Sequence, residues 1–164
     1  MKKSVLAGVV LAAASVASVP AGAHCQVPCG IYDDLLRARL LAEHITTIER
    51  SIKGIQELAG KTAPVDVNQL VRWIENKDTH ADLIAELASE YFLRQRIKAP
   101  AGDDPASAKK FADQLAALHG LLVTSMKAKQ TVDSAIPGQL RELLARFDAL
   151  YFSPEDLRYL EEHR

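Results

Sequence analysis

Two cysteines near the start of the chain are the residues whose spacing best suits chemistry. Cys25 and Cys29 are the only thiols among the 164 residues, and they lie four positions apart. Pro28 and Gly30 flank Cys29 and disfavour a helix, so this segment is expected to turn and bring the two thiols together. Two thiols in one turn either close a small disulfide loop or bind a metal ion.

A secretory leader is predicted to precede this turn. The first residues carry two lysines, an apolar stretch occupies 5–16, and Ala21-Gly22-Ala23 has the small residues of a cleavage site. The apolar stretch is too short to span a hydrocarbon core of about 30 Å, which argues against a permanent membrane anchor. A leader-removing peptidase that cuts off residues 1–23 would leave 141 residues beginning at His24. The mature protein is therefore expected to be exported, to a periplasm or beyond.

Cleavage after Ala23 would change the ligands that the turn can offer. It frees an α-amine on His24 whose ordinary pKa is about 8, so the amine becomes a usable ligand near neutral pH. The His24 amine and the Cys25 backbone nitrogen can close one five-membered ring on a metal, and that nitrogen with the Cys25 thiolate closes a second. Cys29 would supply a fourth donor, and the His24 imidazole stays available as an axial ligand. A planar set of two nitrogens and two thiolates suits Ni(II) or Cu(II) better than tetrahedral Zn(II), and the residues alone do not separate nickel from copper.

Beyond the turn, apolar residues recur at helical spacing in four long segments. The predicted helices occupy 34–59, a segment from Asp66 that can extend to Lys98, a segment after Asp104-Pro105 and a segment from about Pro137, with a short last helix after Ser153-Pro154. Their buried stripes are expected to contain Leu41, Ile45, Ile48, Ile52, Ile55 and Ala59; Leu70, Ile74, Ala81, Ile84, Ala88 and Tyr91; Phe111, Leu115, Leu118, Leu122 and Met126; Leu140, Leu144, Phe147 and Tyr151; and Leu157 and Leu160. These segments predict an all-α fold, an antiparallel four-helix bundle over 34–164.

Several local signals set the expected ends of these helices. Gly60 is a suitable stop for the first helix. Asp66, with Gln69 three residues on, resembles a capping box at the start of the second. The polar run 75–80 leaves two interpretations open for that second helix, one continuous helix or an interruption.

The charge balance excludes one class of partner. The chain has 20 Lys and Arg against 21 Asp and Glu, and removal of the leader would leave 18 against 21. No basic field of the kind that binds a phosphate backbone is present, so nucleic acid is not an expected partner.

The pattern His24-Cys25-x-x-Pro28-Cys29-Gly30-x-Tyr32 resembles the nickel-binding hook of the nickel superoxide dismutases, and we refer to residues 24–33 as the N-terminal hook. The order and length of the helices after it are also similar to that family. The resemblance implies an oxidoreductase that converts superoxide to dioxygen and hydrogen peroxide. It further implies one nickel ion per subunit and a homohexamer of four-helix bundles, each preceded by an irregular hook.

The resemblance also implies roles for individual residues. The His24 amine and imidazole, the Cys25 amide and thiolate, and the Cys29 thiolate would bind nickel, which would cycle between Ni(II) and Ni(III). Tyr32 would shield the open face of the metal and order water there. A cis peptide bond before Pro28 is implied as well, since cis bonds occur chiefly before proline.

Two positions depart from the family pattern. Members of the family orient the axial imidazole with a Glu of the first helix and an Arg of a neighbouring subunit, and alignment places Leu41 and His80 there. Either Glu43 or another group then orients the imidazole, or the axial histidine is held differently in this chain. The remaining histidines of the helical segments are expected to be ordinary helix residues: His44, His119 and His163.

Two functions of other classes stay open at this point. A nonenzymatic nickel or copper carrier would use the same chelate without turnover. A disulfide-tied, exported helical module for protein interactions would be indifferent to metal. The compartment is open too, because the resemblance requires only removal of the leader and is compatible with a cytoplasmic enzyme.

Overall fold

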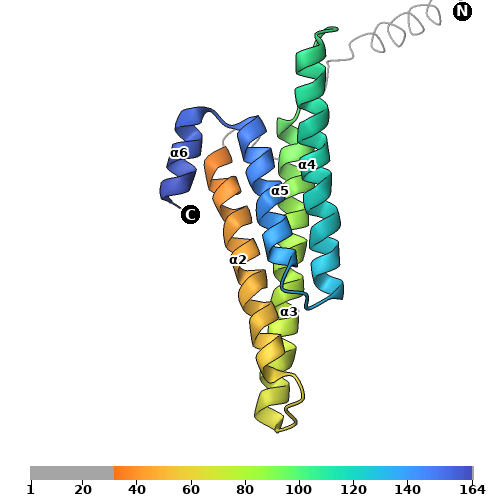
Figure 1. Cartoon of the computed structure of the whole chain (residues 1–164), viewed down its shortest axis with the longest axis vertical. Helices are drawn as coiled ribbons and strands as arrows, with labels where there is room; N and C mark the ends of the chain where they lie inside the picture. Colours follow the sequence, from red (N-terminus) through yellow and green to blue (C-terminus); the bar gives the residue numbers. More distant parts are fainter. Residues whose placement is uncertain (1–31, 164) are drawn as a thin grey trace, which may run out of the picture. The chain divides into compact units, whose positions relative to one another are not determined.

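Four long helices form a bundle in the computed structural model of the chain, and neighbouring helices run antiparallel (Figure 1). The structure describes residues 32–163, so the predicted leader and all of the hook before Tyr32 lie outside the described residues. The helices are α2 (Asp34–Leu58), α3 (Pro64–Glu86), α4 (Pro105–Gln130), α5 (Ile136–Tyr151) and the short α6 (Pro154–Glu162), and a π-helical segment, η1 (Leu87–Arg96), continues α3. Each long helix packs against two others, in the order α2, α3, α4, α5 and back to α2. The predicted four-helix bundle is therefore confirmed.

Side-chain caps and prolines begin most of these helices. The Asp33 carboxylate accepts the Leu36 N–H at 3.1 Å at the start of α2. Asp104 accepts the Ser107 N–H at 3.0 Å at the start of α4. Ser153 and Asp156 form a capping box before α6. Because these caps depend on residues only three positions apart, the sequence shows them directly.

The start of α3 differs from the prediction. The helix begins at Pro64 with Ala63 as its N-cap, and no side chain caps it. The expected capping box of Asp66 and Gln69 is wrong because both residues already lie inside the first two turns. Proline at the first helical position has no N–H to satisfy, which allows the earlier start.

The core follows the predicted stripes with a few exceptions. Fully buried side chains come from every long helix, among them Ile45, Ile84, Leu118 and Leu140. Three predicted core positions are wrong, since Ala59 is the exposed C-cap of α2, and Ile74 and Met126 are 39% and 52% exposed. At these positions the apolar stripe continues along its helix, and no other helix of residues 32–163 covers it.

The second predicted helix is continuous through its polar run but changes its pitch. Residues 75–80 lie within α3, whereas Leu87–Arg96 adopt the wider π-helical register. At the end of this segment the Ile97 N–H donates to the Phe92 carbonyl, five residues back, at 2.9 Å. The α-helical continuation expected toward Lys98 is therefore wrong in its last part, and π-helical turns of this kind often occur at functional sites.

Within residues 32–163, no helix combines the length and the apolar character that crossing a membrane requires.

Candidate metal centre

Tyr32 is the first residue that the structure describes, and it belongs to the predicted hook. His24, Cys25 and Cys29 lie outside the described residues. Tyr32 is the one predicted site residue that the structure places. The surroundings of Tyr32 therefore show how the bundle holds the end of the hook.

The Tyr32 side chain packs against two residues of the bundle. Its ring meets the Tyr91 ring edge to face, with centroids 6.1 Å apart. The Arg37 guanidinium lies over the Tyr32 ring, 4.8 Å from its centroid, in a cation–π arrangement. The phenol is thus held through contacts of its ring.

The Tyr32 backbone is held by polar contacts from η1. The Arg96 Nη2 donates to the Tyr32 carbonyl oxygen at 2.9 Å, and the Tyr91 hydroxyl lies 3.2 Å from that oxygen. Both donors come from one face of the π-helical segment. They connect Tyr32, next to the last residue of the hook, to the C-terminal end of the α3–η1 helix.

Asp34 gathers these donors into a single cluster. Its Oδ1 accepts the Arg96 Nε–H at 2.7 Å and the Tyr91 hydroxyl, and its Oδ2 accepts the Tyr151 hydroxyl at 2.6 Å. We call Asp34, Tyr91, Arg96 and Tyr151 the anchor cluster. It joins α2, η1 and α5 next to Tyr32.

The protonation of the two phenols follows from this setting. Burial, together with the hydrogen bond to the Asp34 carboxylate, raises the pKa of Tyr91 to about 12. Burial and the same carboxylate also raise the pKa of Tyr151. Both hydroxyls therefore stay protonated at physiological pH and act as donors.

Sequence reasoning expected packing roles for Tyr91 and Tyr151 and did not single out Asp34 or Arg96. Tyr91 and Arg96 are five residues apart, which in an α-helix would place them about 140° apart around the axis. The π-helical register is what turns both toward Asp34. The spacing of five residues between a tyrosine and an arginine was the available signal in the sequence. It indicates a shared face only when the segment is known to be π-helical.

The two departures from the family pattern have distinct outcomes. Leu41 is fully buried in the core. His80 of α3 pairs with His44 of α2, with their Nδ1 atoms 2.9 Å apart and their rings edge to face at 4.9 Å. His44, which the sequence suggested to be an ordinary helix residue, is therefore half of a histidine pair.

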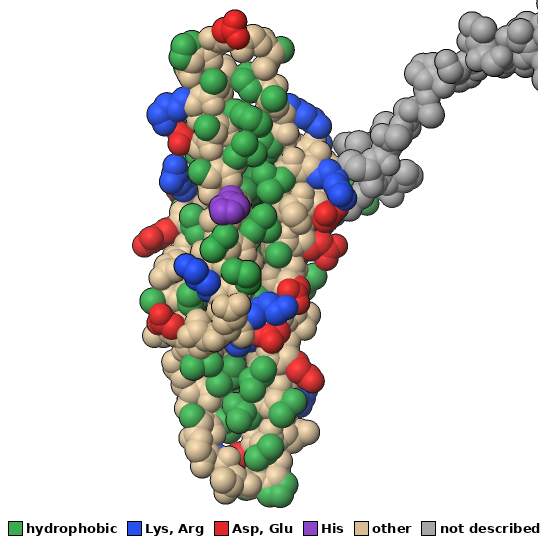
Figure 2. Space-filling view, turned by 90° about the vertical axis from the view of Figure 1, so that its right-hand side faces the viewer, with side chains coloured by type: hydrophobic (Ala, Val, Ile, Leu, Met, Phe, Trp, Pro, Cys, Tyr) green, Lys and Arg blue, Asp and Glu red, His purple; other side chains and the backbone are tan. Residues whose placement is uncertain are grey.

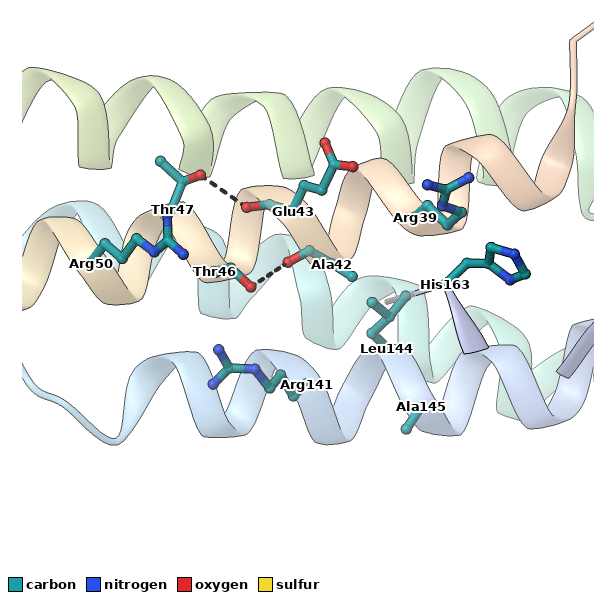
Figure 3. A pocket seen from close by; sticks show the side chains of 10 residues that line it. All are labelled: Arg39, Ala42, Glu43, Thr46, Thr47, Arg50, Arg141, Leu144, Ala145 and His163. Atoms are coloured by element: carbon teal, nitrogen blue, oxygen red, sulfur yellow. Dashed lines mark hydrogen bonds between the residues drawn. The ribbon is translucent and has the colours of Figure 1, made fainter. Parts of the chain in front are cut away.

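A groove of about 690 Å³, lined by both charged and apolar side chains, lies between α2 and α5 (Figure 3). Arg39, Arg50 and Arg141 line it, and Glu43 is the one carboxylate on its wall. His163, at the end of α6, reaches over one end. Three guanidiniums around one carboxylate repel a metal cation, so the groove is not a candidate metal centre.

Within residues 32–163, no three His, Cys, Asp or Glu side chains are arranged to hold a metal ion. A search of curated proteins and a search of solved structures found no match to the chain. A family model described as nickel-containing superoxide dismutase matches residues 19–154, which include the whole hook and the four long helices. The chain therefore belongs to the nickel-containing superoxide dismutases, oxidoreductases with nickel as cofactor and superoxide as substrate.

Proposed function

We propose that the mature chain disproportionates superoxide at the N-terminal hook, with His24, Cys25 and Cys29 as the nickel ligands. One superoxide is oxidised to dioxygen, and a second is reduced and takes up two protons to become hydrogen peroxide. The observation that carries the proposal is that the family match begins before the His24-Cys25-x-x-Pro28-Cys29 motif and includes all of it.

The donor set supports this assignment. An amine, a deprotonated backbone amide and two thiolates form a strong planar ligand field, which suits nickel and favours its higher oxidation state. Nickel bound there would supply a one-electron couple between Ni(II) and Ni(III). Cys25 and Cys29 would hold the ion, and the His24 imidazole would be a further ligand.

The proposal requires that the leader, residues 1–23, be removed. Without the cut, the His24 nitrogen is a neutral peptide nitrogen and cannot serve as an amine ligand. The basic start, apolar stretch and small cleavage residues support a secretory leader and export of the mature protein. Processing by a peptidase in the cytoplasm is the alternative.

Tyr32 is proposed to cover the open face of the metal and order water beside it. The contacts of its ring with Tyr91 and Arg37 support this role, because they limit the positions that the phenol can take.

A homohexamer is the proposed assembly. An exposed apolar stripe on α3 supports self-association, since Val67, Val71 and Ile74 are spaced to share one face and are 44%, 47% and 39% exposed. Figure 2 shows a band of hydrophobic side chains along the face of the bundle that α4 borders, with basic and acidic side chains interspersed along it. Because charges of both signs lie along this face, a second copy of the chain would not be repelled by an excess of one charge.

Native mass spectrometry of the purified mature protein, combined with a superoxide assay, tests the proposal. We expect a chain that starts at His24, carries about one nickel and dismutates superoxide. The Cys25→Ser and Cys29→Ser variants should keep the helical circular dichroism of the wild type and lose turnover. An active enzyme that retains Ala23, or activity in either serine variant, would overturn the ligand assignment.

A further inference from the structure

We propose that the anchor cluster positions the N-terminal hook by holding its last residues against the bundle, and that Asp34, Arg96, Tyr91 and Tyr151 are positioning residues for the nickel site. Only the effect on the nickel site rests on the proposed function. The anchoring itself is a property of the described part of the chain and can be tested without metal.

Two donors converge on one backbone group at the end of the hook. The Tyr32 carbonyl oxygen is approached by the Arg96 guanidinium at 2.9 Å and by the Tyr91 hydroxyl at 3.2 Å. A charged donor and a phenol on one carbonyl hold that peptide unit more firmly than water would. The next residue, Asp33, is held as well, because its side chain and carbonyl accept N–H groups of the first turn of α2.

Other side chains hold the two donors of the Tyr32 carbonyl in place. Arg96 is held by the Asp34 carboxylate, and the two side chains are only 25% and 27% exposed. The other Asp34 oxygen accepts the Tyr151 hydroxyl at 2.6 Å, and the Tyr151 ring stacks on the buried Phe147. Arg96 is thereby fixed by residues of two helices before it reaches Tyr32.

The helical pitch of η1 makes this convergence possible. The π-helical register places Tyr91 and Arg96 on one face, where an α-helix would point them about 140° apart. A wider register gives up well-formed α-helical hydrogen bonds along the segment. In exchange, the π-helical register lets Tyr91 and Arg96 contact both Tyr32 and Asp34.

Covalent distance links the anchor to the ligands. Only Gly30 and Ile31 separate Cys29 from Tyr32, so the Cys29 Cα lies within about 11 Å of the Tyr32 Cα. If Tyr32 could shift relative to the bundle, the position available to Cys29 would vary with it. The nickel ligands would then take up several arrangements instead of one.

Arg96→Gln tests the anchor, with Arg94→Gln as the matched control. Arg94 lies on the same segment but is exposed and pairs with Glu90 on the surface. In the metal-free mature chain, Arg96→Gln should raise the hydrogen-exchange rate of the Leu36 and Arg37 amides, which donate to Asp33, at least tenfold, and Arg94→Gln should leave it unchanged. The comparison is made well below the melting temperature of every variant, so that global unfolding does not contribute.

The nickel-loaded protein supplies a second readout. Arg96→Gln should shorten the half-time of nickel release to a chelator at least fivefold and broaden the electron paramagnetic resonance spectrum of the oxidised enzyme. Tyr151→Phe keeps the stacked ring and removes only the hydroxyl, so a smaller change in the same direction is expected even if an Arg96 variant folds poorly.

Exchange and spectra like those of the wild type in both Arg96→Gln and Tyr151→Phe would overturn the proposal, and so would an equal effect in Arg94→Gln. A wild-type chain that binds no nickel would instead overturn the proposed function, while the exchange measurement on the metal-free chain still decides the anchor.

Discussion

The contact between His44 and His80 shows how two ionisable side chains become coupled by a helix interface. With their Nδ1 atoms 2.9 Å apart, one ring must donate an N–H and the other must accept it, so at least one ring is neutral. Burial lowers the pKa of both histidines, and the charge of His80 lowers the pKa of His44 further against a smaller opposing effect of Glu43. The folded protein therefore prefers the pair without charge at neutral pH.

This preference predicts that the pair makes the fold less stable as the pH falls below about 6.5. The unfolded chain takes up protons on these histidines at a higher pH than the folded chain does, so the free energy of unfolding rises with pH between the two pKa ranges. We expect the denaturant midpoint of the metal-free mature chain to be lower at about pH 5.5 than at about pH 7.5, on either side of the ordinary histidine pKa. His80→Gln should make this fall shallower.

His119→Gln is the control for the histidine pair, because His119 is exposed on α4. It should keep the pH dependence of the wild type. An equally steep loss of stability in His80→Gln would show that the pair does not contribute.

At the scale of elements, the packing of α2 on α3 depends on a glycine in the second half of α2. A Cβ built at Gly54 would come within 2.7 Å of the indole of Trp73, whereas a Cβ at Gly138 of α5 would meet nothing within 4 Å. The absence of a side chain at Gly54 therefore allows the Trp73 ring to lie against the α2 backbone. The sequence pattern showed a buried stripe on both helices but not this close approach.

Gly54→Ala is predicted to destabilise the bundle relative to Gly138→Ala. Both substitutions gain helix propensity, up to about 1 kcal/mol each. Only the alanine at position 54 must push the Trp73 ring aside, and overpacking of this kind costs typically about 1–3 kcal/mol. Equilibrium unfolding in urea should place Gly54→Ala below Gly138→Ala by about that amount. Equal stabilities would mean that the Trp73 ring moves without cost.

At the scale of the whole molecule, the bundle leaves part of its apolar surface uncovered. The α2–α3 hairpin extends past the turn between α4 and α5 (Figure 1), and the exposed stripe of Val67, Val71 and Ile74 lies in this first half of α3. Within residues 32–163, no other helix covers this stripe. A second copy of the chain can do so in a homo-oligomer.

Val71→Asp is therefore predicted to break the proposed homo-oligomer without unfolding the subunit. A charged side chain in an apolar interface is desolvated without a partner, which opposes association. Native mass spectrometry should show a smaller oligomer, and circular dichroism should show an unchanged helical content. Tyr159→Asp introduces the same charge at an exposed apolar position of α6, away from the stripe, and should keep the wild-type mass. An unchanged oligomer in Val71→Asp would place the interface elsewhere.

The helices could be predicted well because their signals are local. Asp33, Asp104 and Ser153 cap helices through N–H groups two or three residues on, and the core stripes recur every three or four residues. The wrong predictions concern positions whose burial depends on whether a neighbouring helix covers them. Ile74 follows the apolar periodicity of its helix, yet it is exposed because no other helix covers it.

The candidate ligands could be identified from the order of residues alone, because His24, Cys25 and Cys29 lie within six positions and their chelating chemistry depends on covalent distance. The contacts that hold the end of the hook became visible only in the folded chain. The contact of Asp34 with Tyr151 joins residues 117 positions apart, and the pairing of Arg96 with Tyr91 depends on a π-helical pitch. Such contacts arise from the packing of whole helices, which fixes distances that no spacing along the chain encodes.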